Sequence, residues 1–532
     1  MQTPLNSLDW AIIAGYAAAV IIGGFWLSRR SAGSLNEYFL AGNTMSPWVV
    51  MFSVLATTQS AATFLGGPDY GYRGDFTYLG SFLGAALAAI VVAKVLITRF
   101  YALGVTTVYE LLNIRYGDAA KRAAGAMYLV GRVFANGARL YMAAVAVSMM
   151  LFFNIEAQSI IAAIILITLI SIGITLAGGV RSVIWSDFGQ FIVYFSAALI
   201  ALMSLWGQLG LSVGEIINAL RDTPDETNKL VLFDFGFDLS KPFSFWAVIT
   251  GVFLLYLGNF GLDQDTTQRL LTCKNAKEGG RALIGSAIIA IPIVFVFVLI
   301  GQLLYLFYHL ETQNIDSSAR ISTFDGEAIT VFMAYILSEM PSGVRGLATA
   351  GVVAAAISTM TSGLNAMSSV LISDFYKPWK ERRAEHASAN NYVPAGRIGM
   401  VLFAALLAAM ATLCFYWQRY TDMALLEFAL SVMAFAYAGL LGVFFVAVFT
   451  TRGSTRSVIA ALITGFIAIV IQQSYVVDVL GLPAALKSLA FPWQLLIGSS
   501  LAGLVCFLGN QTPKPHAPSH NNPNISKGNQ RA

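Results

Sequence analysis

The chain has 532 residues, of which 57% are hydrophobic and 11% are charged, with a formal net charge of +4. A soluble domain usually carries about 25% charged residues, so this composition excludes an ordinary soluble protein and predicts an all-α membrane protein. The small net charge argues against a nucleic-acid partner. The three cysteines, Cys273, Cys414 and Cys506, are too far apart in the sequence for a metal site or a disulfide framework.

Long apolar runs follow one another along the chain and predict about 13 membrane-spanning helices, since one span needs roughly 20 apolar residues. Their approximate positions are 9–28, 46–66, 78–98, 122–152, 157–177, 187–208, 243–263, 281–309, 343–371, 396–416, 424–449, 457–475 and 489–509. The first run follows Asp9 and precedes Arg29 and Arg30, which reverses the charge order of a secretory signal peptide. We therefore expect this run to be retained as a span.

The distribution of Lys and Arg predicts the orientation, because cytoplasmic loops are enriched in these residues. With the N-terminus outside, the inside segments hold most of them, among them Arg99, Arg115, Lys121, Arg181, Arg269, Lys377, Arg397, Arg452 and Arg456. Two outside loops, 209–242 and 310–342, are rich in Asp and Glu instead. We expect a multi-pass protein of a bacterial plasma (inner) membrane, with one transmembrane domain over residues 1–510. Residues 511–532, polar and rich in Pro and Asn, are predicted to form a disordered cytoplasmic tail.

The second predicted span is interrupted by polar residues within 53–72. Its middle carries hydroxyl and amide groups, namely Ser53, Thr57, Thr58, Gln59, Ser60 and Thr63, and Gly66, Gly67 and Pro68 follow. This composition is typical of a broken helix whose freed carbonyl groups can hold a cation, because non-helical backbone survives at membrane depth only where it is buried or lines a cavity. Polar packing between helices is the alternative interpretation.

A second polar stretch, residues 355–374, carries a stripe of hydroxyl groups. Ser358, Ser362, Asn365 and Ser369 share one helical face by the i, i+3, i+4 rule. Hard cations take oxygen ligands, so the stripe can offer a cation site without burying a charge.

Asp187 is the third polar feature, because it begins an apolar run that extends to about residue 205. An ionisable residue inside a membrane is costly and is a candidate for function. The alternative is a solvated helix cap at the cytoplasmic interface, and position alone does not separate the two.

At these residues the chain resembles the sodium/solute symporter family, which includes bacterial galactose, sialic acid and proline symporters and the sodium–glucose cotransporters. The motifs that carry the resemblance are residues 38–42; Ala56, Thr57, Thr58 and Ser60; Tyr109, Glu110, Leu111, Arg115 and Tyr116; Gly178, Gly179, Val183, Trp185, Asp187 and Gln190; Asp263, Gln264, Gln268 and Arg269; and residues 355–365. The block from Gly178 to Gln190 is the most specific of them. The resemblance extends from about residue 8 to residue 510.

The resemblance implies an inverted repeat of five plus five helices of the LeuT-like type, with extra terminal spans. Repeat one would cover about 46–208 and repeat two about 243–449, with solute and ions bound near the midplane at broken helices. The implied function is sodium-coupled import of a small polar organic solute by alternating access. The solute could be a sugar, a sugar acid, an amino acid or an organic anion. We expect no enzymatic activity, no cofactor other than Na⁺ as coupling ion, and a monomer that works in the lipid bilayer.

The resemblance also implies sodium ligands. The principal site would use the backbone carbonyls of Ala56, Gln59 and Ala355 and the hydroxyls of Ser358 and Thr359. Thr359 stands where the family usually has Ser, and it keeps the hydroxyl. A second sodium site, which some members have, would use Asp187, Thr361 and Ser362, with the carboxylate offsetting the charge of the second cation.

The resemblance places the solute between the second and seventh spans, with help from the third and fourth. The candidate residues are Thr58, Thr63, Tyr78, Phe82, Arg132, Asn136, Tyr256 and Asn259, with Arg139 as a further candidate. Arg132 falls where the sialic acid branch has an arginine for the substrate carboxylate, and a guanidinium can bind a carboxylate through two hydrogen bonds. Phe82 stands where that branch has a glutamine. Structural ion pairs are the alternative role for Arg132 and Arg139.

Other functions are less consistent with the sequence. A hydrolysis-driven pump would need a nucleotide-binding loop, and no G-x-x-x-x-G-K-[ST] motif occurs in the sequence. A proton-coupled symporter of the same fold and a transporter-like membrane sensor remain the alternatives.

Overall fold

The structure, a computed structural model, describes residues 5–28, 35–223, 227–311, 323–324, 327–328, 330–383, 392–418 and 425–510. These residues form helices together with one antiparallel pair of short strands, β1 (Thr323–Phe324) and β2 (Glu327–Ala328). The predicted disordered tail, 511–532, lies outside the described residues.

Many of the helices follow one another closely along the chain, whereas residues 222–244 separate α11 from α12. The first half of the chain contains α1 (Ser7–Ser28), α2 (Leu35–Leu40), η1 (Ala41–Asn43), α3 (Pro47–Thr58), α4 (Ala61–Arg73), α5 (Thr77–Gly80), α6 (Phe82–Val91), η2 (Val92–Ile97), α7 (Thr98–Leu103), α8 (Glu110–Tyr116), α9 (Asp118–Phe152), α10 (Ala157–Leu209) and α11 (Val213–Arg221). The second half contains α12 (Phe245–Ala247), η3 (Val248–Val252), α13 (Phe253–Gly261), α14 (Gln264–Leu270), α15 (Ala276–Glu311), α17 (Val331–Ser338), α18 (Val344–Val370), η4 (Leu371–Tyr376), α19 (Lys377–Arg382), α20 (Tyr392–Gln418), α21 (Leu425–Phe449), α22 (Thr455–Ile471), α23 (Ser474–Leu480), η6 (Ala484–Leu486) and α24 (Phe491–Phe507).

Eight helical stretches among the described residues are long and apolar enough to cross a membrane. They are Thr77–Leu103, Asp118–Phe152, Ala157–Leu176, Gly179–Leu209, Ala276–His309, Val344–Arg382, Tyr392–Gln418 and Leu430–Phe449. Three bent helix pairs pass the same test only when each pair is taken as one span, and Ser7–Val20 and Phe491–Phe507 are shorter apolar helices. The all-α membrane fold is thus confirmed, whereas the number of 13 spans stays a prediction.

One of the bends lies where the sequence predicted a broken helix, and a second falls at the end of the predicted seventh span. The pair α3 and α4 is bent by 63°, and the pair Phe245–Gly261 and Gln264–Leu270 is bent by 56°. The first break falls at Gln59 and Ser60, both of which have extended backbone angles. The last carbonyl groups of a helix have no partner within that helix, so each break presents backbone oxygens in the interior of the protein.

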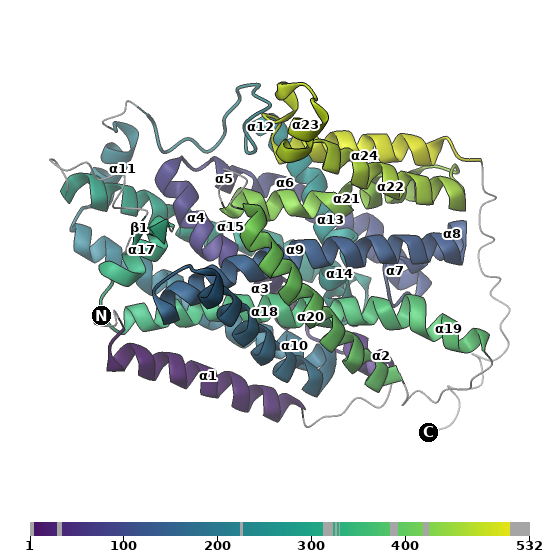
Figure 1. The fold of residues 1–532 in the computed structure, drawn as a ribbon, viewed down its shortest axis with the longest axis horizontal. Helices are drawn as coiled ribbons and strands as arrows, with labels where there is room; N and C mark the ends of the chain where they lie inside the picture. The colour runs from purple at the N-terminus through teal and green to yellow at the C-terminus, as the bar shows by residue number, and fades with distance from the viewer. Residues whose placement is uncertain are drawn as a thin grey trace.

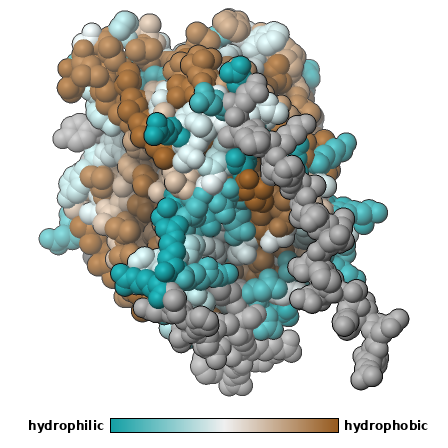
Figure 2. Space-filling model, turned by 90° about the vertical axis from the view of Figure 1, so that its right-hand side faces the viewer, coloured by the Kyte–Doolittle hydropathy of each residue, from teal (hydrophilic) through white to brown (hydrophobic). Residues whose placement is uncertain are grey.

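The two ends of the molecule differ in the elements that they carry. Helices α11 and α17 and strand β1 lie at one end, on the left in Figure 1, and α8 and α19 lie at the opposite end. Figure 2 faces the end with α8 and α19, where hydrophilic side chains gather across the face and hydrophobic side chains lie along its flanks. Such an arrangement suits a face in contact with water between membrane-facing sides.

Helix α18 forms the core of the bundle. It is buried along nearly all of its length and packs against α3, α9, α10, α14 and α20. Small residues allow this contact: a Cβ atom added at Gly351 would lie 2.9 Å from Cβ of Ala197 on α10. Close backbone approach at small residues is a common way to pack helices within membranes. The hydroxyl stripe therefore lies in the interior of the protein and not on its lipid-facing surface.

A kink at Gly179 divides α10 into two helices. Its backbone angles, φ 63° and ψ −170°, belong to a region that is essentially restricted to glycine. A Cβ atom at this position would lie 2.8 Å from the carbonyl oxygen of Tyr38. Two of the sequence motifs, residues 38–42 and the block from Gly178 to Gln190, thus meet at this kink, which directs the second half of α10 and its Asp187 toward the core.

We predict that Gly179→Ala destabilises the protein, because alanine would be strained by about 1–3 kcal/mol at these backbone angles and would also collide with Tyr38. The measurement is the thermal unfolding temperature of the purified protein. Gly173→Ala is the matched control, since no atom lies within 4 Å of its added Cβ and its backbone is helical. Equal unfolding temperatures for the two variants would contradict the structural role of Gly179.

Candidate functional site

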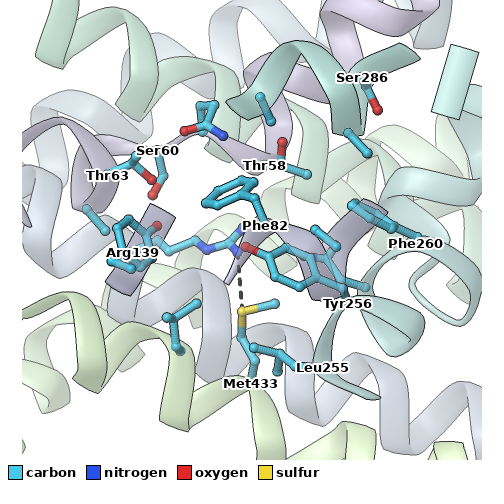
Figure 3. Close-up of a pocket in the computed structure, with 18 residues that line it drawn as sticks. Thr58, Ser60, Thr63, Phe82, Arg139, Leu255, Tyr256, Phe260, Ser286 and Met433 are labelled. Carbon is cyan, nitrogen blue, oxygen red and sulfur yellow. Dashed lines mark hydrogen bonds between the residues drawn. The ribbon is translucent and has the colours of Figure 1, made fainter. Parts of the chain in front are cut away.

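A cavity of about 50 Å³ lies beside the break between α3 and α4. Helices α4, α6, α9, α13, α15 and α21 contribute to its wall (Figure 3). Its lining consists of Thr58, Gln59, Ser60, Ala62, Thr63, Tyr78, Phe82, Ala85, Arg139, Leu255, Tyr256, Asn259, Phe260, Ser286, Ala287, Ala290, Leu430 and Met433. Aromatic rings thus form much of the wall, with several hydroxyl and amide groups and one guanidinium among them.

Most of the predicted substrate residues lie in this lining. They are Thr58, Thr63, Tyr78, Phe82, Tyr256 and Asn259. Arg132 and Asn136 do not line the cavity, although both are buried. Their substrate role stays a prediction, without support from this geometry.

Arg139 is the cation of the cavity. Its guanidinium extends over Phe82 toward Met433, and the atom Nη2 lies 3.4 Å from the sulfur of that methionine (Figure 3). Only 8% of Arg139 is exposed, and no carboxylate of the described residues lies within 4.0 Å of its nitrogens. A buried charge is normally paired, so Arg139 is a positive group that has no countercharge at this site.

Arg132 has the opposite surroundings, seven residues earlier on α9. Its Nη1 atom donates to Oδ2 of Asp263 at 2.7 Å, and its Nη2 atom donates to the carboxylate of Asp265. The hydroxyl of Tyr437 on α21 also donates to Asp263, at 2.5 Å. Arg132 thus ties α9 to the start of α14, and Asp263 extends the link to α21, an arrangement that favours the structural alternative for Arg132.

Asp187 lies where α3, α10, α14 and α18 meet, and it is fully buried. Its Oδ1 atom accepts a hydrogen bond from the hydroxyl of Ser358 at 2.7 Å. Its Oδ2 atom accepts from the hydroxyl of Ser53 at 2.7 Å and from Nη2 of Arg269 at 3.0 Å. The interpretation of Asp187 as a solvated cap is therefore wrong, because its carboxylate is buried and accepts hydrogen bonds from Ser53, Ser358 and Arg269.

Arg269 links Asp187 to the other carboxylates. It forms an ion pair with Asp187 and another with Asp265, and the hydroxyl oxygen of Ser362 lies 3.2 Å from Oδ2 of Asp265. One continuous buried charge network results, in which three carboxylates face two guanidinium groups. Its members are Asp187, Asp263, Asp265, Arg132 and Arg269. This network joins the two broken spans to α9, α10 and α18.

The residues predicted for the principal sodium site lie on α3 and α18, which pack against each other. Ala56 and Gln59 lie at the C-terminal end of α3, where carbonyl groups lack helical partners. On α18 the hydroxyl of Thr359 donates to the carbonyl of Ala355 at 3.0 Å, while Ser358 donates to Asp187. Both hydroxyl oxygens keep lone pairs that a cation can use.

The residues predicted for the second sodium site are only partly brought together by hydrogen bonds in this structure. Ser358 links Asp187 directly to α18. The hydroxyls of Thr361 and Ser362 donate to the carbonyls of Ser358 and Thr359 one turn earlier, at 3.1 and 3.0 Å. Neither hydroxyl bonds to Asp187 in this structure.

Several residues of the site were not predicted from the sequence as parts of it. Asp263 and Arg269 occurred in a motif, but no role followed from the motif alone. Asp265, Tyr437 and the link from Ser53 to Asp187 had no sequence signal beyond the presence of polar residues within apolar spans. Polar residues within apolar spans could have indicated such a network, since buried ionisable groups in membranes pair with one another.

Comparison with known proteins agrees with this geometry. The model of the sodium:solute symporter family matches residues 38–465. The sodium/sialic acid symporter of Aliivibrio fischeri is 27% identical over 88% of this chain and 88% of its own length. The bovine sodium-coupled monocarboxylate transporter 2 is 26% identical over 87% of this chain and 72% of its own length. The solved structure of a Na⁺-coupled sialic acid symporter in a substrate-bound outward-open state aligns with a TM-score of 0.79 at 22% identity, covering 96% of this chain and 99% of that one.

The broken helices, the central hydroxyl-bearing helix and the internal charge network suit a secondary transporter, and the related proteins are sodium-coupled transporters and not enzymes. The chain belongs to the sodium:solute symporter family and couples solute import to sodium. This conclusion confirms the resemblance found in the sequence, together with the prediction of a multi-pass membrane protein whose coupling ion is Na⁺.

We predict that Arg132→Gln destabilises the protein by roughly 3–5 kcal/mol, because it leaves two buried carboxylates with one cation fewer. The measurement is thermal or denaturant unfolding of the purified protein in detergent. Arg139→Gln is the matched control on the same helix, and we expect it to preserve stability because Arg139 has no carboxylate partner in this structure. If both variants lost the same stability, the different roles of the two arginines would be refuted.

Proposed function

We propose that the protein imports a small organic acid as its carboxylate anion, together with sodium. The observation that carries this proposal is Arg139, a buried guanidinium that lines the cavity and pairs with no described carboxylate. A carboxylate is the group that a guanidinium binds best, through two parallel hydrogen bonds. The relatives named above include a sialic acid symporter and a monocarboxylate transporter, whose substrates are both acids.

The shape of the cavity favours a compact acid. Its volume of about 50 Å³ is far below the range of about 300–1,000 Å³ for ordinary small-molecule pockets. Tyr78, Phe82, Tyr256 and Phe260 supply an apolar wall for the body of the solute. A small monocarboxylate suits this wall better than a sugar acid, which would need polar partners for many hydroxyl groups.

Sodium would bind where α3 ends against α18. The proposed principal ligands are the carbonyls of Ala56, Gln59 and Ala355 and the hydroxyls of Ser358 and Thr359. They are hard oxygen donors of the kind that such cations require. Two supporting features are the helix end at Thr58 and the buried hydroxyls of α18.

Asp187 would act on both ion sites through Ser358. Because the hydroxyl of Ser358 donates its proton to Asp187, its lone pairs remain available to a cation. The Oδ1 atom of Asp187 accepts no second hydrogen bond from the described residues, so it retains capacity for a second sodium. Thr361 and Ser362 would complete this second site after their hydroxyls turn from the carbonyls that they now contact.

Transport would proceed by alternating access, in a protein whose N-terminus lies outside the cell. The two broken spans, α3 with α4 and α13 with α14, both contribute to the cavity or to the charge network. Sodium would bridge α3 and α18 and so favour the conformation that accepts the acid. A membrane potential of 100 mV supplies about 2.3 kcal/mol per charge and a tenfold sodium gradient about 1.4 kcal/mol per ion. At least two sodium ions are needed for the potential to drive uptake of a monovalent anion.

We predict that Arg139→Gln lowers sodium-dependent uptake of a small monocarboxylate by about 10- to 100-fold, because a hydrogen bond to a charged group contributes about 1.5–3 kcal/mol. The measurement is uptake of radiolabelled carboxylate into proteoliposomes under an inward sodium gradient. Arg139→Lys, which keeps the charge and loses the two-bond geometry, should lie between wild type and Arg139→Gln. Unchanged affinity for the carboxylate in a folded Arg139→Gln protein would disprove the proposed substrate class.

We predict that Ser358→Ala raises the sodium concentration for half-maximal uptake by roughly tenfold or more, since a charged ligand contact contributes about 1.5–3 kcal/mol. Uptake is measured as a function of sodium at constant ionic strength. Ser369→Ala is the matched control, because it removes another buried hydroxyl of α18 three turns away, one that has no hydrogen-bond partner. A sodium response equal to that of wild type would remove Ser358 from the ligand set.

A further inference from the structure

A second and much larger cavity lies on the lateral surface of the helix bundle. This crevice has a volume of about 700 Å³, and η2, α13, α21 and α24 form its walls. Its lining is almost entirely apolar and consists of Val91, Val95, Leu96, Phe253, Leu254, Leu257, Leu262, Leu441, Gly442, Phe444, Phe445, Val446, Val448, Phe449, Thr450, Leu496, Ser499, Ser500, Gly503, Leu504 and Phe507. It shares no residue with the solute cavity.

The crevice opens onto a hydrophobic surface. Phe445, Phe449 and Leu504 line it, and 63%, 60% and 57% of these residues are exposed. Large apolar side chains on the flank of a membrane protein face lipid hydrocarbon and not water. The space between α21 and α24 is therefore open to acyl chains from the side.

Guanidinium groups gather at one end of the crevice, where α21 ends. Nη1 of Arg99 donates to the carbonyl of Val448 at 3.3 Å, and the guanidinium of Arg452 lies 5.0 Å from the ring centre of Phe507. Both Val448 and Phe507 line the crevice. Arg115 donates to backbone carbonyls in the same turn, at Ala447 and Thr450.

None of these three arginines forms an ion pair with a described carboxylate. Capping of the last carbonyls of α21 explains the position of Arg115, because cations are favourable at a helix C-terminus. This capping role leaves Arg99 and Arg452 without an anionic partner among the described residues, and both charges border an apolar crevice. An apolar crevice with an uncompensated cationic rim is complementary to a molecule that has a long hydrocarbon chain and an anionic head.

We propose that this crevice binds an anionic phospholipid, with an acyl chain between α21 and α24 and the phosphate at Arg99 and Arg452. The positive rim falls on the side that the charge distribution predicts to be cytoplasmic, and basic pockets between transmembrane helices on that side suit anionic head groups. The volume of about 700 Å³ lies within the range of about 300–1,000 Å³ that is usual for ligand pockets.

The bound lipid would also pack against a helix of the solute cavity. Phe253, Leu254 and Leu257 of α13 line the crevice, whereas Tyr256 and Asn259 on the other side of α13 line the solute cavity. Helix α13 is the first half of a broken span, and the π-helical segment η3 precedes it. An acyl chain in the crevice would therefore pack against the back of the solute site, so that loss of the lipid lowers the transport rate.

Native mass spectrometry of the purified full-length protein tests the site. Dioleoylphosphatidylglycerol serves as the anionic probe and dioleoylphosphatidylcholine as the zwitterionic one. We expect the double variant Arg99→Gln/Arg452→Gln to bind phosphatidylglycerol about thirtyfold more weakly, the equivalent of roughly 2 kcal/mol for two arginines near the membrane surface. Arg383→Gln is the matched control, because Arg383 is a cation stacked on Trp379, away from the crevice.

A second variant tests the crevice without changing any charge. Ser500 lines the crevice and is exposed, so Ser500→Trp should fill the space for the acyl chain and weaken phosphatidylglycerol binding by at least tenfold. Thermal unfolding of each variant confirms that it is folded. Equal binding of phosphatidylglycerol and phosphatidylcholine by wild type, or undiminished binding by either crevice variant, would overturn the proposal.

Discussion

The structure depends on a buried charge network that couples helices far apart in the chain. Asp187, Asp263 and Asp265 face Arg132 and Arg269 in a region excluded from water. Burial of charges is costly unless they are paired and hydrogen-bonded, so α9, α10 and α14 can come together only in a register that keeps these pairs. With the carboxylates ionised, the network contains one more negative than positive group. A cation bound beside Asp187 would offset this difference, which gives a physical reason for coupling sodium to the packing of the bundle.

The two arginines of α9 show how one helix can serve structure and recognition at once. Arg132 and Arg139 are seven residues apart, hence on the same face of the helix. Arg132 meets the carboxylates of α14, whereas Arg139 meets the aromatic wall and the sulfur of Met433. The position of the carboxylates thus decides which arginine is neutralised by the protein and which is the one that we propose for the anionic solute.

Local patterns in the sequence predicted the helical class, the break in the second span and the hydroxyl stripe of α18, but not the break at the end of the seventh span. These features depend on composition over 10 to 20 neighbouring residues, and Gly, Pro, Ser and Thr within apolar runs reveal them. The partners of Arg132 were not predictable in this way, because Asp263 and Asp265 lie more than 130 positions away in the chain. For the same reason the sequence could not decide which of Arg132 and Arg139 faces the cavity, nor that Asp187 is paired with Arg269.

The central claim is that sodium and a small carboxylate bind to this protein together. Its most direct test is the shift of the thermal unfolding temperature of the purified protein on addition of a small monocarboxylate, measured in sodium chloride and in choline chloride at the same pH and ionic strength. Ligands that bind only the folded state raise its stability, and coupled ligands raise each other's affinity by the same factor. We expect a clear stabilisation by the carboxylate in sodium and little or none in choline. Equal stabilisation in both salts, or stabilisation by neutral sugars and not by carboxylates, would contradict it.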